Sequence, residues 1–343
     1  MYTKYNPIHS LRMTTQATLM NNMSANSITE TAYAKINLAL DITGRLPNGY
    51  HAVRMVMETI SIHDALTFTL SDKPGIRLTC QMEDDALSVS ELDCGDDNLI
   101  VRAACALLSD AEKSSRLGVE TAGSNRFEAD KKENEKIGLD IALVKRIPMA
   151  AGMAGGSSDA AATLRGVNKL LNLGYTDEEL CITGVTIGAD VPYCILGGSM
   201  LAEGIGEKLT PIPAPPDTYI LIAKPDIDVS TAYVYRQIDS SPSIDHPDVD
   251  GMISAIKEKD LSRMASKLGN VLRDVTAQEY AIVPELEQSM RSQGAKGALM
   301  SGSGPTVFGL FDNKETCMQA LDHIRALYPD IYVSDAVFVS NKQ

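Results

Sequence analysis

The sequence predicts an α+β fold divided into two lobes. The chain has 343 residues, which is more than a single hydrophobic core usually serves. Predicted strands and helices are mixed along it without a strict strand–helix–strand repeat, and this order favours an α+β arrangement over a parallel α/β sheet. A content of 44% hydrophobic and 22% charged residues is typical of a globular protein.

The first lobe is predicted over residues 30–195 and begins with strands. Side chains of alternating character predict a strand from Ala32 to Thr43, and the Asn48-Gly49 pair indicates a turn after it. Apolar runs predict further strands at 53–62, 65–70, 76–79 and 139–144. Helical spacing predicts helices at 99–108 and at 177–187, the second after an N-capping Thr176. A third helix is predicted up to Leu171, with Ser157 or Ser158 as its N-cap.

Two segments of this half are expected to lie outside the packed core. Residues 1–29 are rich in Met, Thr and Asn and have no continuous apolar run, so we expect a disordered N-terminal extension. Residues 109–136 are polar and charged, which predicts a mobile surface insertion.

The second lobe is predicted over residues 196–343. Apolar runs predict strands at 219–223, 307–311 and 332–339, and helical spacing predicts helices at 250–268, 284–293 and 314–327. Residues 239–250 are rich in Pro, Ser and Asp and predict a loop.

Charge and cysteine usage limit the functional classes. The formal net charge of −14 argues against nucleic acid or an anionic membrane as partners. Six cysteines without a Cys-x-x-Cys pair predict reduced thiols in a cytoplasmic protein. Apolar runs of about 18 residues, as a membrane span needs, do not occur. A monomer and a homodimer both remain open.

The run from Lys145 to Ala161 is the most informative part of the sequence. A strand leads into a loop of small residues, which leads into a helix. Such a loop presents free N–H groups and the positive end of a helix dipole, and this arrangement favours a phosphate site. A glycine-rich turn without any ligand is the alternative. The spacing excludes both the Walker A loop and the Gly-x-Gly-x-x-Gly dinucleotide pattern.

Two segments near the N-terminus carry polar side chains in suggestive places. Lys35 and Asn37 share one face of a strand whose other face is apolar, as a solvated strand face also would. Tyr50 and His51 follow a turn, where an aromatic ring and an imidazole suit stacking on a base and hydrogen bonding to its edge. A turn with a surface tyrosine is the simpler interpretation of the second segment.

Two later segments are similarly open. Asp190 lies between small and apolar residues near the end of a predicted short helix, where it can act as a base or as a turn residue. The run from Ser301 to Gly304 can close over a phosphate or form a tight connection between elements.

Taken together and in this order, these segments resemble the GHMP kinase superfamily of ATP-dependent small-molecule kinases. The pattern consists of a lysine strand, a Pro-x3-Gly-x2-Gly-Gly-Ser-Ser-x-Ala loop, Gly-Ala-Asp-Val-Pro and a late Ser-Gly-Ser-Gly. Four stretches resemble the members that phosphorylate 4-diphosphocytidyl-2-C-methyl-D-erythritol, in the non-mevalonate isoprenoid pathway: 34–38, 43–51, 97–100 and 188–192. The resemblance covers about residues 30 to 340 and implies a mixed β-sheet with helices in each lobe.

The resemblance also implies roles for individual residues. Lys35 and Asp190 match the catalytic pair, and Asn37 would contact substrate near the transferred group. Tyr50 and Tyr235 would stack on the cytosine, while His51 would hydrogen-bond its edge. ATP and Mg²⁺ are implied, without identified metal ligands. The residues implied in ATP binding are Asn98, Leu99, Lys145, Pro148, Met149, Ala150, Ala151, Gly152, Met153, Ala154, Gly155, Gly156, Ser157 and Ser158.

The loop departs from the superfamily pattern. Ala150, Ala151 and Ala154 stand where Gly is often found, and Met153 where Leu is. Alanine disfavours positive φ, so we expect strain wherever one of these positions is left-handed. Two other functions compete with the resemblance: a superfamily kinase for a sugar, homoserine or mevalonate-type alcohol, and a non-catalytic nucleotide-binding module. Tyr50-His51 argues against the first, and intact Lys35 and Asp190 argue against the second.

Overall fold

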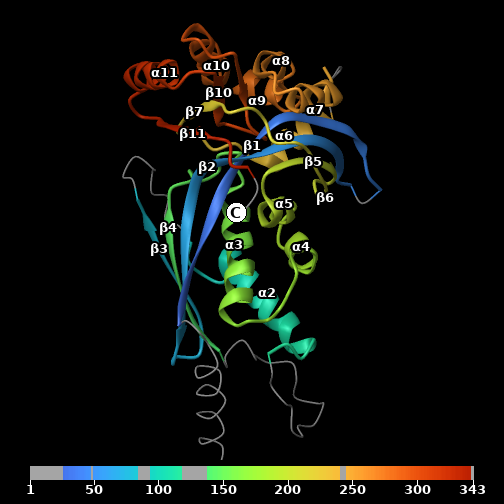
Figure 1. The fold of residues 1–343 in the computed structure, drawn as a ribbon, viewed down its shortest axis with the longest axis vertical. Helices are drawn as coiled ribbons and strands as arrows, with labels where there is room; N and C mark the ends of the chain where they lie inside the picture. Colours follow the sequence, from blue (N-terminus) through green and yellow to red (C-terminus); the bar gives the residue numbers. More distant parts are fainter. Residues whose placement is uncertain (1–25, 48, 84–92, 118–136, 240–244, 341–343) are drawn as a thin grey trace, which may run out of the picture.

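The fold is built from two β-sheets, each covered by helices (Figure 1). The computed structural model describes residues 26–47, 49–83, 93–117, 137–239 and 245–340. Strands and helices are mixed in both parts, so the predicted α+β class is confirmed. Within these ranges no helix is long and apolar enough to cross a membrane.

The first sheet is built around two long antiparallel strands, β1 (Ser27–Arg45) and β2 (His51–Ser71). One half of β2 pairs with β4 (Gly138–Lys145), which pairs in parallel with β3 (Gly75–Met82). The other half pairs with β5 (Ser199–Gly204), and β5 pairs with β6 (Lys208–Pro211). The short β8 (Gly269–Asn270) adds to the free edge of β1.

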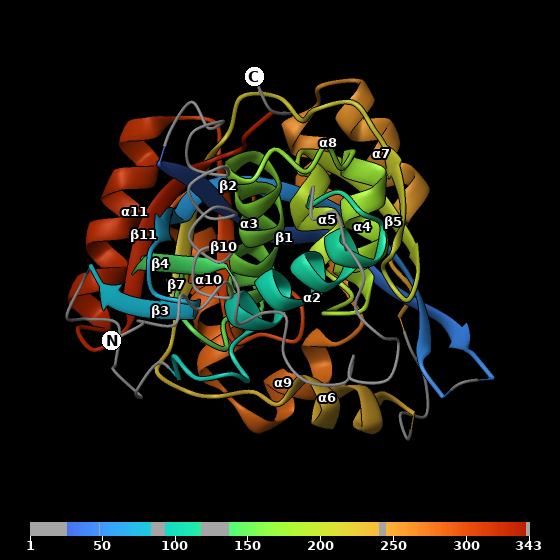
Figure 2. The same cartoon turned by 90° about the horizontal axis from the view of Figure 1, so that it is seen from below.

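Helices cover one face of this sheet and enclose the first core. They are α2 (Leu99–Lys113), α3 (Gly155–Leu170), α4 (Asp177–Val185) and α5 (Val191–Leu196). Figures 1 and 2 show α3 lying along β1, with α2 beside it. Phe68 and Ile141 on the sheet meet Leu107 and Leu164 on the helices, all fully buried.

The second sheet has the order β11-β7-β10-β9 and is antiparallel throughout. Its strands are β7 (Tyr219–Lys224), β9 (Gly297–Met300), β10 (Val307–Phe311) and β11 (Tyr332–Val337). One face packs on α10 (Ile282–Ser292) and α11 (Lys314–Leu327). The other face meets β1, β2 and α7 (Val249–Lys257), so one core cluster joins both sheets.

Several strand predictions need correction. The strands expected at 53–62 and 65–70 are one strand, because the polar Asp64 between them is fully buried and bonded rather than at a turn. β5, β6, β8 and β9 were not expected. Since β5 and β6 follow residue 196 yet belong to the first sheet, the division of the chain at that residue stays a prediction.

Helix predictions also need correction. The helix expected over 250–268 is two helices, α7 and α8 (Leu261–Ser266), because Lys259 takes a left-handed φ of 57° and Asp260 caps a new start. The short helices α5, α6 (Thr231–Ile238) and α9 (Arg273–Glu279) were not expected. Thr176 caps α4 through a capping box, as expected for that residue.

Parts of the two segments expected outside the core, residues 1–29 and 109–136, belong to regular elements. Ser27 to Glu30 belong to β1, and residues 109–113 complete α2, where Ala111 is fully buried. These stretches continue the periodicity of their elements, and the one buried polar residue in them, Glu30, pairs with Arg165 and Lys169. Residues 1–25 and 118–136 lie outside the described ranges, so the rest of both predictions stays untested.

The loop between β4 and α3 contains left-handed alanines. Ala150 and Ala154 take φ of 48° and 58°, whereas Ala151 does not have a positive φ. Ala154 is the N-cap of α3 and makes no side-chain capping bond, so the expected cap by Ser157 or Ser158 is wrong. Both serines lie instead in the first helical turn. The expected strain therefore falls on two of the three alanines.

Glu58 is a buried acid without an ion-pair partner among the described residues. Its side chain is 1% exposed, Oε2 accepts from Ser199 Oγ at 2.7 Å, and Oε1 has no hydrogen-bond partner there. Burial raises the pKa of this carboxyl from 4.5 to about 8. Protonated Glu58 therefore stabilises the fold fully below pH 4.5, and this contribution is lost as pH rises towards 8.

We predict that Glu58→Gln removes this loss. Between pH 5 and 8 the free energy of unfolding of the wild type should fall by roughly 1.4 kcal/mol per pH unit relative to that of the variant. Urea unfolding at pH 5, 6.5 and 8 measures the difference. Glu203→Gln, an exposed carboxylate on β5, serves as the control and should follow the wild type. Parallel pH profiles for the wild type and Glu58→Gln would contradict a neutral, buried Glu58.

We also predict that Ala154→Gly stabilises the protein by about 1 kcal/mol, because glycine adopts the left-handed conformation without a Cβ clash. The matched control is Ala162→Gly inside α3, which should destabilise by at least about 1 kcal/mol. Thermal unfolding of both variants shows whether each substitution raises or lowers the stability. A loss of stability in Ala154→Gly would show that the loop carries no such strain.

Candidate active site

A cavity of about 1170 Å³ gathers most of the predicted site residues from both halves of the chain. It lies where the first sheet, the loop before α3 and α6 meet. The predicted residues that line it are Lys35, Asn37, Tyr50, His51, Asn98, Leu99, Lys145, Pro148, Met149, Ala150, Ala151, Gly152, Ala154, Gly155, Gly156, Ser157, Asp190 and Tyr235.

Two predicted residues have side chains that do not line the cavity. Met153 is fully buried, and its carbonyl oxygen accepts the backbone N–H of Lys35 at 3.1 Å. Ser158 is 2% exposed, and its Oγ donates to the carbonyl oxygen of Tyr33 at 2.6 Å. Both residues fasten the loop and α3 to β1.

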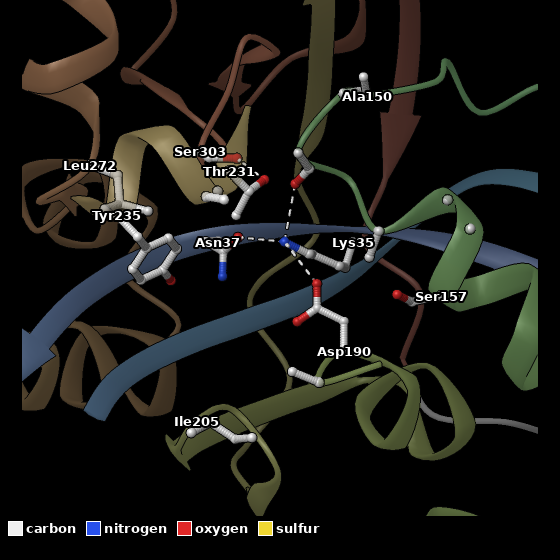
Figure 3. Close-up of a pocket in the computed structure, with 18 of the residues that line it drawn as sticks. Lys35, Asn37, Ala150, Ser157, Asp190, Ile205, Thr231, Tyr235, Leu272 and Ser303 are labelled. Carbon is white, nitrogen blue, oxygen red and sulfur yellow. Dashed lines mark hydrogen bonds and ion pairs between the residues drawn. The ribbon is translucent and has the colours of Figure 1, made fainter. Parts of the chain in front are cut away.

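Lys35 occupies the middle of the cavity (Figure 3). Its Nζ donates to Asn37 Oδ1 at 2.8 Å and to the carbonyl oxygen of Gly152 at 3.0 Å, and lies 3.9 Å from Asp190 Oδ2. Lys35 and Asn37 are 4% and 1% exposed, so the interpretation as a solvated strand face is wrong. The pairing of β1 with β2 shifts register on both sides of these residues, an irregularity typical of strands beside active sites.

Asp190 reaches the cavity from the N-terminus of a helix rather than from the end of one. It is the N-cap position of α5, and its side chain makes no capping bond. The preceding helix, α4, ends earlier, at Val185. The carboxylate is about one-third exposed, so one oxygen lies near Lys35 while the group remains open to the cavity.

The two glycine loops dock on one another at the edge of the cavity. Ser301 Oγ donates to the carbonyl oxygen of Gly152 at 3.1 Å. Gly152 takes φ of 68°, and a Cβ there would lie 2.3 Å from the carbonyl oxygen of Ser301. Gly302 and Ser303 line the cavity, so the second loop borders the site as well as connecting β9 to β10.

A second buried lysine holds both ends of the first loop. Lys145 Nζ lies 2.5 Å from Asp64 Oδ2 and 2.7 Å from Asp159 Oδ2. Asp64 Oδ1 also accepts the N–H groups of Arg146 and Ile147, where the loop begins. Burial lowers the pKa of Lys145, but the two carboxylates outweigh it and raise that pKa overall. Burial raises the pKa of Asp159 to about 7.

The start of α2 lies against the start of α3. Asn98 caps α2 by accepting the N–H of Ile100 at 2.8 Å, and its Nδ2 donates to the carbonyl oxygen of Asp93 at 2.6 Å. A Cβ on Gly156 would lie 3.3 Å from Leu99 Cδ1. This end of the cavity therefore combines an apolar wall with the N-terminus of α3.

Tyrosine and histidine side chains form the other end. Tyr50 is 61% exposed, while Tyr235 is half-buried, and burial raises the pKa of its hydroxyl. The rings of His51 and Tyr235 lie 5.2 Å apart and are tilted by 43°. Figure 3 shows Tyr235 on one side of Lys35, with Ser157 and Ala150 on the other.

Sequence reasoning missed several residues that line the cavity. Asp239 contacts His51, and Thr231 Oγ1 lies 2.8 Å from Ser303 Oγ. The cavity is also lined by Asp159, Arg45 and Arg236. Of these residues, Asp159 directly follows the serine pair of the loop motif, and this position is the signal that could have found it. Among the described residues, no group of three His, Cys, Asp or Glu side chains forms a metal site.

Family models match both halves of the chain. The model for the GHMP kinases N terminal domain matches residues 98–198, and that for the GHMP kinases C terminal domain matches residues 252–330. A 4-diphosphocytidyl-2-C-methyl-D-erythritol kinase of Lachnoclostridium phytofermentans is 45% identical over 84% of this chain and 89% of its own length. The 4-diphosphocytidyl-2-C-methyl-D-erythritol kinase of Lachnospira eligens is 42% identical over 87% of this chain and 94% of its own length.

Solved structures agree with this similarity. A crystal structure of 4-(cytidine 5'-diphospho)-2C-methyl-D-erythritol kinase is 27% identical, with a TM-score of 0.71 over 91% of this chain and 99% of that one. Homoserine kinase from Cytophaga hutchinsonii is 20% identical, with a TM-score of 0.68 over 93% and 96%, and shares the fold. The superfamily that the motifs resemble is thus confirmed, and the chain belongs to the 4-diphosphocytidyl-2-C-methyl-D-erythritol kinase family of GHMP kinases.

Proposed function

We propose that this protein transfers the γ-phosphoryl group of ATP to the C2 hydroxyl of 4-diphosphocytidyl-2-C-methyl-D-erythritol, giving ADP and the 2-phosphate. This reaction belongs to the non-mevalonate isoprenoid pathway. The observation that carries the proposal is one cavity with Lys35 and Asp190 between a phosphate-type loop and a pair of aromatic side chains. The names of relatives more than 40% identical support the substrate.

ATP is proposed to occupy the end of the cavity formed by the loop before α3. The first turn of a helix has unsatisfied N–H groups, and Ala154 offers them no side-chain cap. Leu99 and the apolar wall beside Asn98 suit the adenine ring. Lys145 reinforces the loop through Asp64 and Asp159, so we assign its side chain to holding the loop rather than to direct phosphate contact.

Magnesium is proposed to arrive with ATP. Mg²⁺ keeps several waters and binds through substrate phosphates with one or two protein oxygens, which fits a site without three clustered ligands in the described ranges. The Ser157 hydroxyl lines the cavity at the start of α3 and is a suitable oxygen. Ser158 is excluded from this role, because its hydroxyl is buried and donates to Tyr33.

Lys35 and Asp190 are proposed to carry the chemistry. A tertiary alcohol is a weak nucleophile, so a carboxylate that accepts its proton assists attack on the γ-phosphorus. Asp190 is open enough to accept that hydrogen bond. The Lys35 ammonium is held in place by Asn37 and Gly152, where it can stabilise charge on the transferred group.

The cytidylyl half of the acceptor is proposed to lie at the tyrosine end. Tyr50 and Tyr235 offer two ring faces, and His51 offers a hydrogen-bonding edge. Binding energy from this remote part positions the reacting hydroxyl. We also propose a cytoplasmic location, which suits six cysteines with no disulfide among the described residues.

We predict that Asp190→Asn lowers kcat at least about 100-fold while ATP affinity changes less than about threefold, because the general base and its ion pair with Lys35 are lost but the loop before α3 is unchanged. A coupled assay for ADP release measures turnover, and calorimetry measures ATP binding. Asp250→Asn, an exposed carboxylate outside the cavity, is the control and should retain full activity. Full activity in Asp190→Asn would remove Asp190 as the base, and a folded wild type without turnover would refute the proposed reaction.

We predict that Tyr50→Ala raises KM for the cytidylyl substrate about tenfold or more, because base–aromatic stacking contributes roughly 1–3 kcal/mol. KM for ATP should stay within about threefold, since Tyr50 lies at the other end of the cavity. Steady-state kinetics with each substrate varied in turn separates the two effects. An equal rise in both KM values would contradict the proposed placement of the base.

A further inference from the structure

The contact between His51 and Asp239 has no role in the reaction proposed above. His51 Nε2 lies 2.6 Å from Asp239 Oδ1, a length typical of a strong, charge-assisted hydrogen bond. The partners come from distant parts of the chain, His51 at the start of β2 and Asp239 at the end of α6. Both line the cavity at its tyrosine end.

Asp239 determines which nitrogen of His51 carries the proton. The His51 hydrogen bond lowers the pKa of the Asp239 carboxyl, so this group is ionised at neutral pH and can only accept. Nε2 must therefore be the donor. In a neutral imidazole the other nitrogen, Nδ1, is then an acceptor. Nδ1 has no hydrogen-bond partner in the part of the chain that the structure describes.

The surroundings hold both groups in position. Arg45 Nη1 lies 3.6 Å from Asp239 Oδ2, so a second contact restrains the carboxylate. The Tyr235 ring lies 5.2 Å from the imidazole and limits its rotation. The His51 side chain is only 10% exposed, so little water competes for its nitrogens.

An acceptor at this position distinguishes pyrimidine bases. Cytosine carries an exocyclic amine, which donates, at the place where uracil carries a carbonyl oxygen, which only accepts. Two acceptors facing each other leave both unpaired, and a site built for a donor rejects the analogue without one.

We propose that Asp239 is a positioning residue that holds His51 as the Nε2–H tautomer, so that Nδ1 accepts from the exocyclic amine of cytosine and rejects uracil. The inference rests on the proposed cytidylyl substrate. The inference adds Asp239 to the residues that determine base selectivity. Asp239 acts through His51 and does not touch the base.

Calorimetry with CDP and UDP tests the selectivity without any phosphoryl transfer. The wild type should bind CDP at least about tenfold more tightly than UDP. Asp239→Ala should reduce this ratio to about threefold or less. Asp250→Ala is the matched control, because Asp250 also pairs with a β2 side chain, Arg54, but lies outside the cavity. It should keep the wild-type ratio.

Nitrogen-15 spectra of the histidine rings give a readout that general loosening of the site would not mimic. The chain has five histidines, and His51→Gln identifies the His51 signals by their disappearance. The wild type should show a neutral ring protonated at Nε2, and Asp239→Ala should show a mixture of tautomers. A doubly protonated ring or an Nδ1–H ring in the wild type would overturn the proposal.

The outcomes separate this inference from the proposed function. An unchanged CDP-to-UDP ratio in folded Asp239→Ala overturns the role of Asp239, whatever the turnover. A second outcome is that the wild type prefers CDP, that Asp239→Ala lacks this preference, and that the wild type has no kinase activity. This outcome refutes the proposed reaction and supports the inference. Wild type without preference between CDP and UDP overturns the inference, and ADP release with the natural substrate still tests the reaction.

Discussion

The buried ammonium of Lys35 is the interaction on which the site depends. A charge with 4% exposure is costly unless it is paired and hydrogen-bonded. Lys35 meets this need through Asn37 on its own strand, Gly152 in the loop and Asp190 before α5. Its backbone N–H also donates to Met153. One residue therefore fixes the loop, the strand and the candidate base relative to each other, and a shift in any of them would remove one partner of a buried charge.

Lys145 is a second buried ammonium whose partners hold the loop, on the side opposite Lys35. Its pairing with Asp64 and Asp159 ties the start of the loop to β2 and its end to the N-terminal part of α3. Two cations thus hold the loop from both sides, and this support explains how left-handed Ala150 and Ala154 persist without glycine. The cavity of this acidic chain, whose net charge is −14, is lined by both signs of charge: Lys35, Arg45, Lys145 and Arg236 lie beside five aspartates.

Several parts of the fold and site were predictable because they are local. The helix 314–327 was predicted with its observed bounds, since Asn313 caps it and apolar residues recur on one face. The loop before α3 was recognisable because it needs small residues in sequence. Lys35, Asp190, Tyr50, His51 and Tyr235 were singled out from short motifs and the resemblance, and all five line one cavity.

The sequence by itself determined the fold class, the family and the residue types of the site, because short-range patterns encode them. Only the tertiary structure decided whether Lys35 faces water, because burial depends on α3 and the second loop covering a strand that looks half-solvated alone. It also decided that Asp239 meets His51, 188 residues away along the chain. No local pattern encodes such a pairing, since it forms only when α6 and β2 join the same core cluster.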